Sequence, residues 1–172
     1  PYYVTEEVAA EQRRTMSARK PVAGSIAFQG EGKAFGLPYA YANTLEGYEL
    51  AGAELKSPLP TTASNIEAGA ANFELMCTHC HGLEGKGDGA ISRNGHIMGI
   101  PDFSNKLKDL PEGNIYHTLM YGKGLMGSHA SQISQKGLWQ IVQYVQVLQK
   151  GGQMPTFDSN GVAIVTETEN ND

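Results

Sequence analysis

The sequence predicts an all-α domain that follows a long, largely irregular N-terminal extension and precedes a short acidic tail. Apolar residues recur at helical spacing in three segments after residue 63, and glycine-rich stretches separate these segments. The first 63 residues hold too few clustered apolar side chains to form a core of their own. We therefore divide the chain into an extension (1–63), a helical domain (64–152) and a tail (153–172).

The first helix of the domain is expected to begin near Ser64. Ser64 and Glu67 match a capping box, in which each side chain bonds the backbone N–H of the other residue. A stripe with spacings of 4, 3 and 4 follows, formed by Ile66, Ala70, Phe73 and Cys77. One face of this helix therefore leads directly into the two cysteines of the chain.

Two more helices are predicted after a loop. Residues 81–99 contain six glycines, which favours a loop without regular structure. Residues 112–121 place Ile115 four positions before Leu119, as on one helix face. The last helix ends at Gly151-Gly152. Its apolar face comprises Leu138, Trp139, Ile141, Val142, Val145 and Leu148.

The N-terminal extension differs in character. Residues 4–20 are compatible with a polar helix, and residues 44–56 with a second one that the linker 57–60 ends. The apolar side of the second helix is formed by Leu45, Tyr48 and Leu55. The glycine- and aromatic-rich stretch 28–41 has no period. We expect the extension to wrap the helical domain or a partner.

The net charge of −5 is unevenly distributed. The segment 1–65 carries −1, the segment 66–152 is neutral, and the segment 153–172 carries −4. A nucleic-acid-binding protein would present a basic face, so this function is disfavoured. The neutral central segment also argues against long-range electrostatic steering toward distant partners.

The pentapeptide from Cys77 to His81 indicates the chemistry of the domain. Its sequence is Cys-Thr-His-Cys-His, and Cys77 and Cys80 are the only cysteines. Two thiols at this spacing can add to the two vinyl groups of a porphyrin, and the next histidine can bind the iron. The motif therefore predicts one covalent haem c with His81 as the proximal iron ligand.

Two other uses of the cysteine pair are less consistent with the sequence. A thioredoxin-like redox pair would need a preceding strand in a βαβ pattern, and none is visible. A structural zinc site would need further ligands, and no second cysteine pair is present.

The sixth iron ligand has several candidates. Met126 is favoured because it lies 45 residues after His81, in a glycine-flanked loop that returns into the last helix. A thioether ligand favours ferrous iron and raises the reduction potential, whereas a second histidine would lower it. The other candidates are His96, Met98, His117, Met120, His129 and Met154.

These motifs, in this order, resemble those of class I cytochromes c over roughly residues 64–150. The resemblance implies that Gly69 and Phe73 cross the last helix near Trp139 and Tyr144. It also implies that the carbonyl of Pro101 accepts a hydrogen bond from Nδ1 of His81. The matching motifs are Gly69-x-x-x-Phe73, Cys77-x-x-Cys80-His81-Gly82, Gly85-x-Gly87-Asp88-Gly89, Gly99-x-Pro101, Tyr121-Gly122-x-Gly124-x-Met126 and Trp139-x-x-Val142-x-Tyr144-Val145.

The extension resembles part of one subunit in particular. Residues 36–39, 43–48 and 55–59 are similar to the mono-haem cytochrome c subunit of alternative complex III, a bacterial membrane quinol:electron-acceptor oxidoreductase. The resemblance implies a subunit on the periplasmic side of the inner membrane, often with a lipid-modified N-terminal cysteine. Its implied partners are iron–sulfur and multi-haem cytochrome subunits, and a terminal oxidase or soluble carrier as acceptor.

The leading hypothesis is therefore an electron-transfer subunit with no substrate of its own. A free periplasmic electron shuttle is an alternative, although a shuttle would gain little from the long extension. A haem enzyme or gas binder is a third possibility. It would need an open sixth coordination position, which a methionine at position 126 would close.

Overall fold

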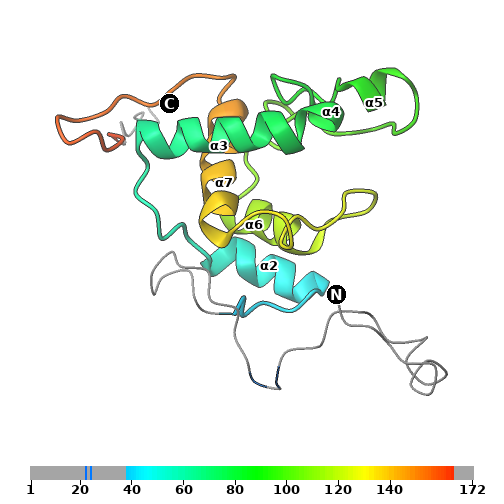
Figure 1. The fold of residues 1–172 in the computed structure, drawn as a ribbon, viewed down its shortest axis with the longest axis horizontal. Helices are drawn as coiled ribbons and strands as arrows, with labels where there is room; N and C mark the ends of the chain where they lie inside the picture. Colours follow the sequence, from blue (N-terminus) through cyan, green and yellow to red (C-terminus); the bar gives the residue numbers. More distant parts are fainter. Residues whose placement is uncertain (1–21, 23, 25–37, 165–172) are drawn as a thin grey trace, which may run out of the picture.

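The computed structural model describes Val22, Gly24 and residues 38–164. In this part of the chain the regular elements are all helices, and β-pairing is limited to isolated bridges. The predicted all-α class is thus confirmed. The predicted helix 4–20 lies outside the described residues. Figure 1 shows α2 (Leu45–Glu54), α3 (Ala63–Met76), α4 (Thr78–His81), α5 (Ala90–Arg93), α6 (Glu112–Tyr121) and α7 (Gln135–Gln149).

The core forms where α3 lies across α7 (Figure 1). A Cβ atom built on Gly69 would overlap the carbonyl group of Gln140, so only glycine permits this approach of the two backbones. The rings of Phe73 and Tyr144 meet edge to face at 5.3 Å. The predicted contact of Gly69 and Phe73 with the last helix is confirmed. Trp139 instead stacks on Tyr116 of α6, at 4.2 Å between ring centroids.

The start of α3 differs from the predicted capping box. The helix is capped by Thr62, whose backbone is extended and whose hydroxyl accepts a hydrogen bond from the N–H of Asn65 at 3.2 Å. The Asn65 side chain also donates to the carbonyl of Pro60 at 2.9 Å. These bonds fix the helix start two residues upstream, so Ser64 lies in the first turn and is not the cap.

The later helices agree closely with expectation. Helix α6 has the predicted bounds, and α7 begins three residues before Leu138, with Ser134 as its N-cap. Gly151 and Gly152 follow α7 with φ values of 70° and 83°, which end the helix. The predicted loop 81–99 is wrong in one respect, because it contains the one-turn helix α5.

Helix α2 packs against α6 through small residues. Its buried positions are Gly47, Ala51 and Gly52, whereas Leu45 is 74% exposed. A Cβ on Gly113 of α6 would overlap the carbonyl oxygen of Ala51. The predicted apolar side is therefore wrong at Leu45, whereas Leu55 is half-buried against the core and Tyr48 is half-buried at the wall of a cavity. The closest approach to α6 is made by the small residues, because the two backbones leave no room for large side chains there.

The segment before α2 also covers α6. The Tyr39 hydroxyl and Nδ1 of the buried His117 are hydrogen-bonded at 3.0 Å. The Tyr121 hydroxyl donates to the carbonyl of Tyr41 at 2.8 Å. Of the two expected roles of the extension, wrapping the helical domain or contacting a partner, the described tyrosines Tyr39 and Tyr41 take the first. Phe28 and Phe35 lie outside the described residues.

Candidate haem-binding site

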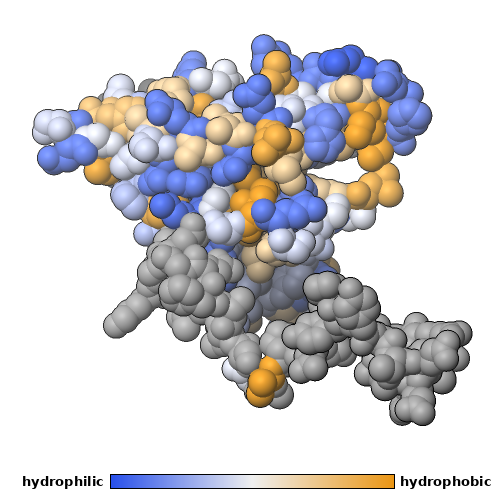
Figure 2. All heavy atoms as spheres, viewed as in Figure 1, coloured by the Kyte–Doolittle hydropathy of each residue, from blue (hydrophilic) through white to orange (hydrophobic). Residues whose placement is uncertain are grey.

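One cavity of about 760 Å³ contains every site residue that the sequence predicted. Its wall includes Cys77, Cys80, His81, Pro101 and Met126. The volume lies within the range of about 300–1,000 Å³ that is typical of small-molecule and cofactor sites. In Figure 2, apolar residues gather around the opening between the α4–α5 region and the loop that follows α6.

The cysteine pair sits at the junction of two helices. Cys77 ends α3 and precedes α4, with φ −120° and ψ −29°, so the chain bends at this residue. Cys80 and His81 lie on the single turn of α4. Gly82, with φ 74°, then ends this turn. The bend allows both cysteines and the histidine to line the same cavity.

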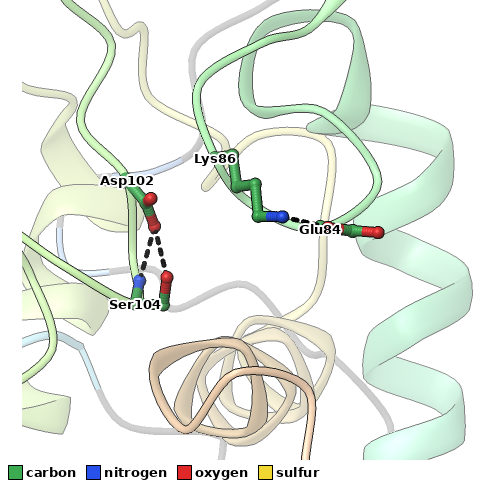
Figure 3. A network of polar contacts seen from close by, with 4 residues as sticks. All are labelled: Glu84, Lys86, Asp102 and Ser104. Atoms are coloured by element: carbon green, nitrogen blue, oxygen red, sulfur yellow. Dashed lines mark hydrogen bonds and ion pairs between the residues drawn. The ribbon is translucent and has the colours of Figure 1, made fainter.

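The ring of His81 is held by an aromatic neighbour. It stacks on Phe103 at 4.9 Å with an interplanar angle of 19°. The N–H of Phe103 donates to the carbonyl of Gly85 at 3.0 Å. The next turn is closed by Asp102, whose carboxylate accepts two hydrogen bonds of 2.7 Å from Ser104 (Figure 3). The segment after Pro101 is therefore a firm support for the histidine.

The electrostatics of the site favour neutral groups. Burial, and then the neighbouring Cys80, raise the pKa of the Cys77 thiol to about 12. Thioredoxin-like redox cysteines instead have a lowered pKa, so Cys77 differs from them in this respect. Burial, and then His129 and His79, lower the pKa of His81 to about 4. At neutral pH its imidazole is uncharged and has a lone pair for a metal.

The residues of the cavity fit a covalently attached haem. Two free cysteines share the cavity with an imidazole whose Nδ1 is buried and has no hydrogen-bond partner. Around them the wall is mostly hydrocarbon, which suits the porphyrin faces. Its apolar members are Phe73, Met76, Ile97, Ile100, Phe103, Leu107, Leu110, Ile115, Leu119, Ile141 and Val145.

Pro101 is placed as predicted, but its expected hydrogen bond is not formed. The residue lines the cavity together with His81. Nδ1 of His81 nevertheless has no partner, so the carbonyl of Pro101 does not accept from it in this structure. The role of Pro101 in fixing the imidazole tautomer stays a prediction.

The cavity reduces the seven candidates for the sixth ligand to three. Met98, Met126 and His129 line it, whereas His96, His117, Met120 and Met154 do not. Met98 is 83% exposed. Met126 is partly buried and packs against the core.

Met126 lies on a loop that is anchored to the end of α6. The last carbonyl groups of this helix lack partners within the helix, and the loop supplies them. The bonds run from Gly122 N to Thr118 O (2.8 Å), from His129 N to Leu119 O (2.9 Å) and from Ser128 Oγ to Met120 O (2.5 Å). Within the loop, the backbones of Lys123 and Met126 bond to each other in both directions, at 2.9 and 3.1 Å.

Sequence reasoning missed several residues of the site, and Phe103 and Tyr48 matter most among them. Phe103 stacks on His81, and Tyr48 reaches the cavity wall from α2. Phe103 follows Pro101 by two positions, which is a signal in hindsight. Tyr48 has no comparable signal, because only the packing of α2 on α6 brings it to the cavity.

Comparison with known proteins identifies the domain. Residues 64–145 match the family described as "Cytochrome C oxidase, cbb3-type, subunit III". No curated protein matches the chain. Among the helices that the structure describes, none is long and apolar enough to cross a membrane.

Two solved structures show a partial likeness. A chain of the reducing HAO-like protein complex of Kuenenia stuttgartiensis is 26% identical, with a TM-score of 0.48 over 55% of this chain and 48% of that one. The present chain thus spans about half the length of that chain. Cytochrome cL from Methylophaga aminisulfidivorans is 18% identical, with a TM-score of 0.43 over 64% of this chain and 73% of that one. The family match and the cavity together identify the helical domain as a class I c-type cytochrome domain whose cofactor is a covalently bound haem c.

Proposed function

We propose that this cytochrome domain carries electrons as a subunit of a membrane quinol-oxidising respiratory complex. It holds one haem, with His81 and Met126 as iron ligands. The observation that supports this assignment most directly is the shared cavity of Cys77, Cys80, His81 and Met126. When bound there, the haem supplies one-electron chemistry between ferrous and ferric iron.

The surroundings suit electron transfer without catalysis on a substrate. The wall is largely apolar, and desolvation disfavours the charged forms of both His81 and Cys77. A low-dielectric wall strengthens the effect of the iron ligands on the reduction potential. With a methionine as the sixth ligand there is no open position for an enzyme substrate or a gas. The protein is therefore not an enzyme on its own but part of an oxidoreductase.

The subunit role rests on the extension and on charge. Residues 66–152 have no net charge, so long-range steering toward a partner is weak, and a permanent complex supplies proximity instead. The proposed neighbours are iron–sulfur and multi-haem cytochrome subunits, and the acceptor is a terminal oxidase or a soluble carrier. We place the protein on the periplasmic side of a bacterial inner membrane, associated with the membrane through the complex.

Truncation tests the subunit role. The cut belongs before residue 38, because residues 38–55 pack on α6 and their loss would expose that helix. Deleting residues 1–37 should leave a folded cytochrome with an unchanged optical spectrum that no longer co-purifies with the membrane complex. If the truncated protein still co-purifies in full with the membrane complex, another surface of the protein must dock it. That result would not support the shuttle or the haem-enzyme alternative.

Substitution of Met126 tests the iron ligation. Met126→Ala should abolish the weak far-red sulfur-to-iron absorption band of the ferric protein and lower the reduction potential, because the thioether stabilises ferrous iron. Matched variants are Met98→Ala, at an exposed methionine of the same cavity, and Met120→Ala, at a methionine outside it. Both should keep the band. A band that persists in Met126→Ala and disappears in Met98→Ala would assign the ligand to Met98.

A further inference from the structure

We propose that Tyr48 of the N-terminal extension is part of the haem site and positions the turn that carries Met126. The proposal rests on the function proposed above. Tyr48 lines the cavity, and it is the one described lining residue that precedes α3. The family match begins only at residue 64, so this contribution comes from outside the matched segment.

The backbone of Tyr48 is fixed by α6. Its carbonyl accepts a hydrogen bond of 2.7 Å from the side chain of Asn114, which is buried. The side chain of Asn114 in turn lies where a Cβ atom on Gly52 would stand. Thr44 caps the first turn of α2 by accepting from the N–H of Gly47 at 3.0 Å. Helix α2 therefore holds Tyr48 in one place relative to α6.

The ring of Tyr48 is held on two sides. The imidazole of His117 meets it edge to face, at 5.6 Å between centroids and an interplanar angle of 80°. His117 is itself hydrogen-bonded to Tyr39. The ammonium group of Lys123 lies 4.0 Å from the centroid of the Tyr48 ring. This distance is within the range of a cation–π interaction.

Lys123 connects the Tyr48 ring to Met126. The two residues that bond across the turn are Lys123 and Met126, and both line the cavity. Gly124 and Leu125 form the tip of this turn, and Leu125 is 80% exposed, so the tip has little support of its own. Contact with Tyr48 therefore restrains the turn at the end nearest α6. Loss of the ring should let the Met126 turn move away from the iron more often.

The test uses the full-length protein with its haem and the variants Tyr48→Ala, Tyr48→Phe and Lys123→Gln. Imidazole should displace the native sixth ligand of the ferric iron about fivefold faster in Tyr48→Ala and Lys123→Gln. Tyr48→Ala should also change the circular dichroism of the Soret band, which reports aromatic packing on the haem. Tyr48→Phe keeps the ring and should behave as the parent protein does.

Leu50→Ala is the matched control on the same helix, because Leu50 is 46% exposed and does not line the cavity. Unchanged imidazole rates and Soret dichroism in Tyr48→Ala would overturn the proposal. If Tyr48→Ala does not hold haem, the Lys123→Gln variant provides the test, because the Lys123 side chain is exposed and its replacement should not affect folding. An unchanged imidazole rate in Lys123→Gln would then overturn the proposal. If the parent protein lacks the far-red band, Met126 is not the iron ligand, and the proposed function fails on that point alone. The Soret dichroism of Tyr48→Ala still tests, independently, whether Tyr48 is part of the haem site.

Discussion

Replacement of Gly69 by alanine should lower the melting temperature of the protein, although alanine is the better helix former. By helix propensity alone, the change would stabilise α3 by about 1 kcal/mol. The new Cβ atom would, however, overlap the carbonyl carbon and oxygen of Gln140 on α7. Both are backbone atoms of a packed helix and cannot turn aside. Overpacking of this kind costs ~1–3 kcal/mol, so the net effect should be destabilising, and more so for Gly69→Val.

The sign of the change makes this a sharp test of the helix crossing. Ala71→Val is the matched control, because Ala71 is exposed on the same helix and its β-branched replacement carries only a propensity cost. Thermal melts followed by helical circular dichroism compare the variants. Gly95→Ala is not a suitable control. An added Cβ atom at Gly95 would meet no other atom, but the φ of +75° at this residue would strain an alanine. A higher melting temperature for Gly69→Ala would contradict the crossing.

Local patterns were sufficient to predict most of the helical domain. The bounds of α6 and the glycine stop after α7 follow from periodicity and from Gly151-Gly152, which act within a few residues. The packing of α2 could not be predicted in this way. Its buried face consists of Gly47, Ala51 and Gly52, and small residues give almost no hydrophobic period. Only the partner helix shows why they are small.

In the haem site, too, some residues could be predicted from local sequence and others depend on tertiary packing. Cys77, Cys80 and His81 are contiguous, so their proximity is fixed by the covalent chain and could be predicted with no knowledge of the fold. Met126 could be favoured because a glycine-flanked loop returns to the last helix. The place of Tyr48 depends on a contact between α2 and α6, more than sixty residues apart in sequence. No spacing rule covers such a contact.

The missing hydrogen bond at His81 has a related origin. The carbonyl of Pro101 was expected to accept a hydrogen bond from Nδ1 of His81. Whether this bond forms depends on differences of a few tenths of an ångström to an ångström in backbone position, which the sequence does not specify. In the structure both residues line the cavity, but Nδ1 stays without a partner. An unpaired buried polar atom costs about 1–3 kcal/mol, so a small shift of the 99–103 segment that forms this bond would be favourable.

Substitution of both cysteines should have the largest effect on the cofactor. In the parent protein, denaturation in acidified organic solvent should leave the haem on the polypeptide, because two thioether bonds hold it. The double variant Cys77→Ala/Cys80→Ala should release all of its haem into the solvent under the same conditions. Each single variant should retain haem through the remaining thiol. Absorbance of the polypeptide fraction measures the retained haem, and the parent should hold one haem per chain.

Stability should follow the cofactor in the same variants. Phe73, Leu119, Ile141 and Val145 line the cavity, and haem contacts cover apolar surface that would otherwise meet water. A ligand that binds only the folded state stabilises it, and a covalent one cannot dissociate as the chain unfolds. The double variant should therefore melt at a lower temperature than the parent. Leu83→Ala, at an exposed residue shortly after the motif that does not line the cavity, is the control and should keep both the haem and the melting temperature. Haem that leaves the parent chain in acidified solvent would refute covalent attachment, because no noncovalent ligand set survives that treatment.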